Sequence, residues 1–236
     1  MRKVKINSFV EFINHSNFFD ILTEQVIFRG QPIQGDLVPG VGRTLSDLDS
    51  TYHEREALNR LKKLGASFIP QETDLDLLVR AQHYGLETRL LDWTANSLAA
   101  LWFACADRSH NGDVFVYALE VDDLMMEGID YEKDPFGTKK TRAFQPRLNN
   151  ARVTAQDGWF TLHVYSRKSK RFVPLEKNNE VKNFLHEFCI PAELRMEMLR
   201  ALDRHGVSSR TLFPDLEGLC RYLNWKRTLN SPSSAH

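Results

Sequence analysis

The sequence predicts an α+β protein, with helices packed on a split, mostly antiparallel sheet and a C-terminal helical subregion at about residues 190–225. Two observations favour this fold class. Short apolar runs bounded by turn residues, of which DVFVYALEV at 113–121 is the clearest, are typical of buried strands. Segments with helical spacing lie between these runs, and 42% of the 236 residues are hydrophobic, which is enough for a substantial core.

The N-terminal segment predicts a helix followed by a strand. Ser8 and Glu11 have the spacing of a capping box, so residues 1–19 are expected to form an N-terminal helix. The run EQVIFRG then has the apolar character of a short strand that ends at Arg29 and Gly30.

The next segment predicts two helices. Leucines recur at helical spacing in residues 46–65 and stop at Gly65, which is expected to end the helix in the left-handed conformation. Thr73 is the expected cap of a second helix, and Gly85 is the expected end of it.

A strand, a central helix and a long loop are expected next. TRLLDWT at 88–94 is short and apolar enough for a strand, and Asn96 or Ser97 can cap the helix SLAALWFACAD, which is apolar almost all round. Residues 122–150 show turn residues and basic clusters without a sustained period. This pattern predicts a long functional or mobile loop.

The C-terminal third predicts further strands and then helices. RVTAQDGWFTLHVY at 152–165 predicts a strand pair or a bulged strand around Asp157-Gly158. A short strand should precede Pro191, which suits the first position of a helix. Asp215 is the expected cap of the last helix, and residues 226–236 are expected to be a disordered tail.

Composition narrows the location and the partners. Lysine plus arginine equals aspartate plus glutamate at 31 each, so no net field draws the whole molecule to nucleic acid or to an anionic membrane. The N-terminus lacks the apolar core of a signal peptide, and no stretch approaches the roughly 20 apolar residues of a membrane span. We therefore expect a cytoplasmic protein without a membrane partner.

The cysteines and histidines give no sign of a disulfide framework or a metal site. Cys105, Cys189 and Cys220 are odd in number and far apart, which predicts reduced, buried thiols. The eight histidines do not pair at the spacing of metal ligands, and the chain has no CxxC. We expect no metal.

The stretch AQHYGLETRLLDWT at 81–94 concentrates the side chains that reaction sites use. His83 could shuttle protons, orient a ligand or pack as an amphipathic ring. On a strand, alternation places Arg89 on one face and Asp92 with Thr94 on the other. A buried polar network that fixes the joint between strand and helix is the structural alternative.

Arg29 stands at the end of a strand and before a glycine, where the backbone can approach a ligand closely. Its guanidinium offers bidentate donors and a permanent charge, which suit phosphate or diphosphate. An ordinary salt bridge to one of the many carboxylates explains the same residue equally well.

Several motifs in combination resemble the FRG domain family. They are Phe28-Arg29-Gly30, AQHYGLETRLLDWT with the SLAALWFA helix behind it, DVFVYALEV, and the element Gln156-Asp-Gly-Trp-Phe160. The closing segment IPAELRMEMLRALDRHGVSSRTLFPDLEGL is also similar to the C-terminal part of the family. The resemblance implies an FRG domain over about residues 20–223.

The same layout is similar to that of ADP-ribosyltransferases, which hold NAD with a first-strand arginine or histidine and use a late-strand glutamate. Carried over, this implies NAD binding by Arg29, Gly30, Tyr84, Arg89 and Thr94, and catalytic roles for Arg29, His83, Asp92 and Gln156. Gln156 stands where the glutamate is expected. Because an amide carries no charge, Asp157 or Asp92 would have to supply the carboxylate.

These implications predict an NAD-binding ADP-ribosyltransferase or NAD-cleaving enzyme, with a protein or nucleic acid as acceptor and a role in bacterial or phage conflict. One alternative is a non-catalytic module that binds a nucleotide or nucleic acid through the same arginine pocket. Another is a metal-free nuclease that uses His83 with Arg29 and Arg89. The sequence does not predict the oligomeric state.

Overall fold

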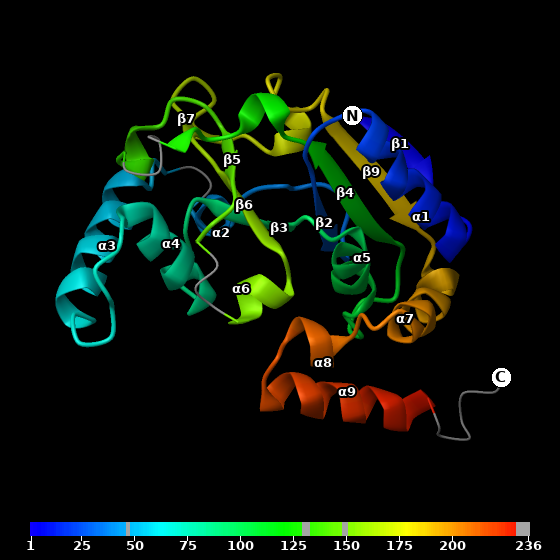
Figure 1. The fold of residues 1–236 in the computed structure, drawn as a ribbon. Coiled ribbons are helices and arrows are strands. Elements are labelled where there is room, and N and C mark those ends of the chain that lie inside the picture. Colours follow the sequence, from blue (N-terminus) through cyan, green and yellow to red (C-terminus); the bar gives the residue numbers. More distant parts are fainter. Residues whose placement is uncertain (46–47, 129–132, 148–150, 230–236) are drawn as a thin grey trace.

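The computed structural model describes residues 1–45, 48–128, 133–147 and 151–229, and it confirms the α+β prediction (Figure 1). Within these ranges a seven-stranded sheet has the order β1-β9-β4-β2-β3-β6-β5. The pairing of β1 with β9 is parallel and the other pairings in this sheet are antiparallel. The strands are β1 (Arg2–Lys5), β2 (Val26–Gln31), β3 (Leu90–Thr94), β4 (Val114–Glu120), β5 (Arg142–Phe144), β6 (Gly158–Leu162) and β9 (Leu185–Ile190), with β7 (Tyr165–Ser166) and β8 (Arg171–Phe172) in a separate hairpin.

The large sheet separates into two halves between β2 and β3. Strands β2 and β4 pair over all six residues of β2, whereas the register between β2 and β3 contains the single pair Phe28 and Thr94. One half is therefore β1-β9-β4-β2 and the other is β3-β6-β5. The sequence predicted a split sheet, and the strand pairing is weakest at this junction, next to Arg29.

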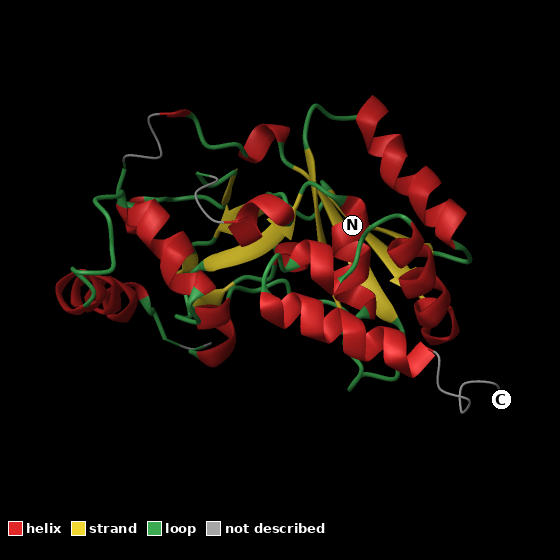
Figure 2. Ribbon diagram, turned by 60° about the horizontal axis from the view of Figure 1, so that its bottom comes forward, coloured by secondary structure: helices red, strands yellow, loops and turns green. Residues whose placement is uncertain are grey.

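Helices cover both halves. They are α1 (Phe9–Asn17), α2 (Gly40–Thr44), α3 (Thr51–Leu64), α4 (Asp74–His83), α5 (Ser97–Cys105), α6 (Ala151–Ala155), α7 (Arg195–Arg204), α8 (Ser209–Leu212) and α9 (Leu216–Leu229). Short 3-10 turns are η1 (Phe18–Ile21), η2 (Asp122–Leu124), η4 (Pro135–Gly137), η5 (Leu175–Lys177) and η6 (Ala192–Leu194). Helices α3 and α4 lie at the opposite side of the molecule from α1 (Figure 1). Helix α9 is the last helix before the C-terminus (Figure 2).

The helix starts follow the capping residues that the sequence predicted. Ser8 accepts a hydrogen bond from the backbone N–H of Glu11 at 3.1 Å, and Thr73 accepts one from Asp76 at 3.1 Å. Asn96, rather than Ser97, caps α5, and Asp215 accepts from Gly218 at 2.7 Å to cap α9. Each cap satisfies a backbone donor that a helix start leaves unpaired.

Helix α5 packs directly on β2 because Gly30 has no side chain. A Cβ atom at Gly30 would lie 1.8 Å from the carbonyl oxygen of Ala100 and 2.6 Å from the backbone nitrogen of Ala104. The small residues of α5 therefore approach the strand that carries Arg29. Around this contact, α1, α5 and α7 bury the face of the sheet that contains Phe28, Val116 and Phe188.

Two other clusters complete the core. Leu58 of α3 and Leu78 of α4 pack with Leu90, Phe160 and Leu162 from the second half of the sheet. The opposite face of the sheet is covered in part by the segment around η5, in a cluster that includes Ile27, Leu91, Trp93, Tyr117 and Leu175. Among the described residues, no helix is both long and apolar enough to cross a membrane.

Several sequence predictions about local structure are wrong. Residues 1–19 contain strand β1 in addition to a helix, because the polar segment RKVK pairs with the distant β9. Residues 151–155 form helix α6 rather than a strand, and Asp157, with φ of 45°, turns the chain into β6. Gly65 ends α3 with φ of −96°, outside the left-handed region.

Three more expectations need correction. The segment 122–150, predicted to be irregular, contains β5 within its described part. The tail predicted over 226–236 is helical to Leu229, and the rest of it lies outside the described residues. Cys220 is exposed, in contrast to the buried Cys105, and the cysteines are free thiols.

Candidate functional site

A cavity of about 360 Å³ lies where the sheet separates, between β2, β3 and helices α4, α5 and α6. We call it the split-sheet pocket. It brings together six of the residues that the sequence predicted: Arg29, Gly30, His83, Asp92, Thr94 and Gln156. Its volume is within the range of small-molecule sites.

Arg29 reaches across the split from β2 to β3. Its Nη1 donates a hydrogen bond to the carbonyl oxygen of Asp92 at 2.8 Å, and its Nε donates to Gln31 Oε1 at 3.3 Å. The side chain is only 19% exposed. Burial lowers the pKa of Arg29, Asp92 opposes this change, and Arg43 adds to it. The guanidinium nevertheless stays charged at physiological pH, because arginine titrates far above it.

Asp92 supplies a fixed carboxylate beside this guanidinium. Its Oδ1 accepts a hydrogen bond from Gln82 Nε2 at 2.8 Å, while its Oδ2 lies 4.0 Å from Arg29 Nη1. Gln82 is oriented in turn by the hydroxyl of Thr88. The Asp92 side chain is 63% exposed, so the carboxylate is accessible from solvent. The described residues that line the pocket include no other carboxylate.

His83 is the last residue of α4 and lines the same cavity. Burial is the largest cause that lowers its pKa, followed by the positive charges of Arg152 and Arg80, while Asp92 raises it. The imidazole is therefore predominantly neutral near pH 7, because its ordinary pKa is about 6.5. A neutral imidazole can accept a proton from a nucleophile.

Thr94 and Gln156 have contacts that join elements of the fold. Thr94 Oγ1 donates to the carbonyl oxygen of Gln156 and accepts from the backbone N–H of Asn96 at 2.9 Å. Gln156 Nε2 donates to the carbonyl oxygen of Leu212 at 3.0 Å. Gln156 lies between α6 and β6, not on a strand, and its amide ties the pocket to the C-terminal helix α8.

Two of the predicted residues lie outside the pocket. Arg89 is buried and forms two hydrogen bonds with Glu54, at 2.7 and 3.1 Å, and a third with Thr51 at 2.9 Å. Tyr84 caps α4, is 78% exposed and does not line the cavity. The structure therefore leaves Arg29 as the arginine of the predicted set that faces the cavity.

Gln82 and Arg152 line the pocket although they were not among the predicted site residues. Gln82 lies within the stretch 81–94, but a glutamine that orients a carboxylate has no signature in a sequence. Arg152 precedes Gln156 by four residues, which is one helical turn. This relation follows only once residues 151–155 are known to be helical.

The described residues do not include a set of side chains that could bind a metal ion. Across the described ranges, no group of three or more histidine, cysteine, aspartate or glutamate side chains could hold a metal ion. The described lining of the split-sheet pocket offers two guanidinium groups, one carboxylate, one imidazole, two side-chain amides and one hydroxyl.

Residues 24–113 match the family model described as the FRG domain. This segment of the chain is similar to the FRG domain. The matched segment runs from the start of β2 to the start of β4, so it supplies Arg29, His83, Asp92 and Thr94 to the pocket. Gln156 and Arg152 come from the chain after the matched part of the FRG domain. No curated protein and no solved structure shows significant similarity to this chain.

Proposed function

We propose that the split-sheet pocket binds NAD as a substrate and cleaves the bond between nicotinamide and ribose, for ADP-ribosyl transfer or hydrolysis. The observation that carries this proposal is the pairing of Arg29 with Asp92 at 4.0 Å in an open cavity. A guanidinium can hold a diphosphate, and a nearby carboxylate can offset the positive charge that develops on the ribose.

The reaction follows from these groups. The glycosidic bond breaks, its electron pair leaves with nicotinamide, and the ribose carbon becomes cationic. Asp92 stabilises this cation, while Gln82 keeps the carboxylate in place at 2.8 Å. Water or the nucleophilic group of a protein or nucleic acid then bonds to the ribose carbon, and its proton passes to the neutral imidazole of His83.

Asp92 is assigned the electrostatic role because Gln156 is not suited to it. An amide carries no negative charge, and the Gln156 side chain already donates to Leu212. We propose that Gln156 and Thr94 position the pocket walls. Asp157, the other carboxylate that the sequence offered, does not line the cavity.

The proposal is tested by nicotinamide release from NAD by purified protein. We expect Asp92→Asn to lower the rate by about 100-fold or more, as for the loss of a group that stabilises transition-state charge. Arg29→Ala should lower kcat/KM by about tenfold to 100-fold through the loss of a charge-assisted contact. Asp157→Asn makes the same chemical change as Asp92→Asn outside the pocket and should leave the rate unchanged.

Folding is checked in each variant by its melting temperature. If the wild-type protein is folded, releases no nicotinamide with any acceptor offered and shows no change in melting temperature with NAD, the proposal is overturned. A loss of activity in Asp157→Asn but not in Asp92→Asn would show that Asp157, and not Asp92, stabilises the charge on the ribose. Mass spectrometry of the protein and of added nucleic acid then identifies the acceptor.

Phosphate binding without turnover is the second candidate function. Arg29 lines the pocket with its guanidinium 4.0 Å from the Asp92 carboxylate. A guanidinium in this position would suit a nucleotide or a nucleic-acid phosphate, with binding that weakens steeply as salt rises. The nuclease alternative loses support, because Arg89 is paired with Glu54 outside the cavity.

A further inference from the structure

Positive charge is concentrated in two short segments outside the split-sheet pocket. Residues 135–147 and 163–175 contain no aspartate or glutamate. Arg147 pairs with Asp76 at 3.5 Å. The other exposed or half-exposed cations of the two segments are Lys139, Lys140, Arg142, Arg167, Lys168, Lys170 and Arg171. In a chain with equal numbers of acidic and basic residues, these seven side chains form a local excess of positive charge.

The fold brings the two segments together around the buried guanidinium of Arg89. This group lies 4.7 Å from the ring centroid of Phe136 in η4 and 5.9 Å from that of Phe172 in β8. Lys139 follows Phe136 by three residues, and Arg171 comes directly before Phe172. Strands β5 and β7 accordingly lie at the same end of the molecule (Figure 1). We call the surface formed by the seven cations the basic face.

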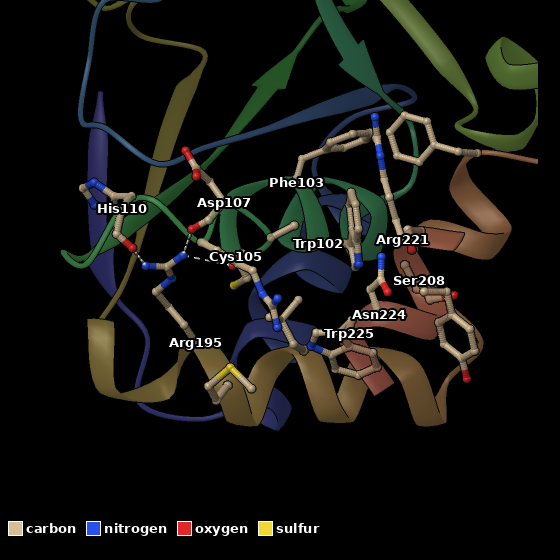
Figure 3. Close-up of a pocket in the computed structure, with 18 of the residues that line it drawn as sticks. Trp102, Phe103, Cys105, Asp107, His110, Arg195, Ser208, Arg221, Asn224 and Trp225 are labelled. Atoms are coloured by element: carbon tan, nitrogen blue, oxygen red, sulfur yellow. Dashed lines mark hydrogen bonds between the residues drawn. The ribbon is translucent and has the colours of Figure 1, made fainter. Parts of the chain in front are cut away.

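The cations of the basic face have no partner within the described protein. None of the seven side chains forms an ion pair or a hydrogen bond with a described residue. Two arginines at a cavity of about 750 Å³ between α5, α7 and α9 provide a contrast. Arg195 donates to three backbone carbonyl oxygens (Figure 3), and Arg221 pairs with Glu217. Arginines paired in this way serve the fold, whereas unpaired cations are available to an external anion.

Part of the basic face is concave. A hollow of about 460 Å³ has Lys139, Lys140 and Arg142 in its lining. Asp134 is the one acidic residue among the described lining residues, and its carboxylate accepts a hydrogen bond from Arg55 at 2.7 Å. The described lining of the hollow therefore carries a net positive charge.

Lys170 places a cation where the backbone favours glycine. It lies in the turn between β7 and β8 with φ of 49°, in the left-handed region. The backbone N–H of Ser169 donates to Ser166 Oγ at 3.2 Å within this turn. The local conformation does not account for a lysine at this position, whereas a role for its charge does.

The basic face lacks exposed large apolar side chains. Among the described residues, those side chains all lie outside 135–147 and 163–175. Stable attachment to a membrane adds apolar insertion to basic charge, and protein interfaces are centred on buried apolar anchors. Single-stranded nucleic acid is held by stacking of its bases on aromatic rings. A duplex presents its phosphates outward and can be bound by cations alone, so a duplex fits this surface best.

We propose that the basic face binds the phosphate backbone of double-stranded nucleic acid without sequence preference. Lys139, Lys140 and Arg142 contact the backbone from the hollow, and the cations of the β7–β8 turn contact it from the other segment. Contacts to phosphate carry no sequence information, and they release counterions, so binding weakens as salt rises. This proposal does not depend on NAD cleavage.

The test is fluorescence anisotropy of labelled nucleic acids with the whole protein. The probes are two DNA duplexes of equal length and unrelated sequence, an RNA duplex of that length and one of the DNA single strands. We expect the two DNA duplexes to bind within about twofold of each other and more tightly than the single strand. Binding of either kind of duplex supports the proposal, and the comparison identifies the preferred form.

Variants on both segments connect binding to the basic face. Lys139→Gln with Lys140→Gln should weaken duplex binding by at least about tenfold and lower the slope of log affinity against log salt by about 2. Lys170→Gly should lower the slope by about 1. Because glycine adopts the left-handed conformation without strain, Lys170→Gly should not lower the melting temperature. Binding and stability therefore separate in this variant.

Two controls are matched to these changes. Lys5→Gln with Arg200→Gln also removes two exposed cations, from β1 and α7, which lie far from β5 and β7 (Figure 1). It should change the affinity by less than about twofold. Asp36, with φ of 52°, is also in the left-handed region. Asp36→Gly therefore relieves the same backbone strain without removing a cation and should not weaken binding.

Several outcomes overturn the proposal. One is that no duplex binds the folded wild-type protein at low salt, or that anionic phospholipid vesicles bind it and duplexes do not. Another is tighter binding of the single strand than of the duplex. Equal losses in the two double variants would mean that general charge, and not the basic face, determines affinity. Loss of binding in Arg29→Ala with full binding in Lys139→Gln with Lys140→Gln would place the nucleic acid in the split-sheet pocket. Failure of nicotinamide release leaves this test unaffected.

Discussion

Arg29 lies on β2 and Arg89 comes directly before the neighbouring strand β3, but the two side chains have different surroundings. Arg89 is paired bidentately with Glu54 and packs over the ring of Phe136 at 4.7 Å. Arg29 donates to a backbone carbonyl and has its nearest carboxylate 4.0 Å away at the edge of a cavity. A buried cation with a close counterion fixes the fold, whereas one with a distant counterion can bind an external anion.

The largest expected effect separates these roles through stability. Glu54→Ala leaves the buried charge of Arg89 without its partner and should reduce the free energy of unfolding by about 3–5 kcal/mol. Urea unfolding monitored by circular dichroism measures the change. Glu217→Ala, which removes a carboxylate from the exposed pair with Arg221, should cost less than about 0.5 kcal/mol. Equal losses in the two variants would mean that Arg89 does not depend on Glu54.

The next effect concerns the strand that holds Arg29. Gly30→Ala would place a methyl group 1.8 Å from Ala100 O, so α5 must move away from β2. We expect a loss of about 3 kcal/mol, at the upper end of overpacking effects. Gly128→Ala meets no atom within 4 Å and should be close to neutral. Unchanged unfolding of Gly30→Ala would contradict the assigned contact. The absence of a side chain at Gly30 is thus required for the packing of α5 on β2, and it affects ligand binding only through this packing.

The contrast between the two arginines could not be read from the sequence. Capping residues were predictable because Ser8, Thr73 and Asp215 act on backbone groups three residues away. The partner of Arg89, in contrast, is 35 residues distant in the chain. The alternation of side chains along a strand correctly placed Arg89 and Asp92 on opposite faces. It could not show which of these faces would line the cavity, because that depends on how α3 and α4 pack against the strand.

The missed elements have related causes. Strand β1 has the polar sequence RKVK and becomes a strand only by pairing with β9 near the other end of the chain. Helix α6 spans only the five residues Ala151–Ala155, so its helical period is too short to detect. As a result Gln156 was expected on a strand, and Arg152 was not expected in the pocket.

The pKa of His163 is lowered by burial and by the positive charges of both arginines, so the pH dependence of stability is sensitive to them. Burial is the main cause that lowers its pKa to about 3, and Arg29 and Arg89 lower it further. Below the unfolded pKa of about 6.5, the unfolded chain takes up a proton that the folded protein does not. The free energy of unfolding therefore decreases as the pH is lowered. Between pH 7 and pH 5 this residue should account for a loss of about 2 kcal/mol.

The variant His163→Gln removes this titration and should flatten the stability profile between pH 7 and pH 5 by that amount. Urea unfolding at several pH values measures the slope. His53→Gln alters an exposed histidine and should leave the slope as in the wild-type protein. If the slope of His163→Gln equals that of the wild type, His163 is not held neutral in the folded state.

The smallest expected effect tests whether the missing glutamate matters. Gln156→Glu supplies a carboxylate at the position where ADP-ribosyltransferases use one, but a carboxylate cannot donate to Leu212 O as the amide does at 3.0 Å. We expect a loss of about 1 kcal/mol in unfolding free energy, the net value of one hydrogen bond, and no increase in nicotinamide release. Gln145→Glu, outside the pocket, is the matched change for the added charge. A gain in nicotinamide release specific to Gln156→Glu would mean that the charge is needed there, and would shift the electrostatic role away from the Asp92 carboxylate beside Arg29.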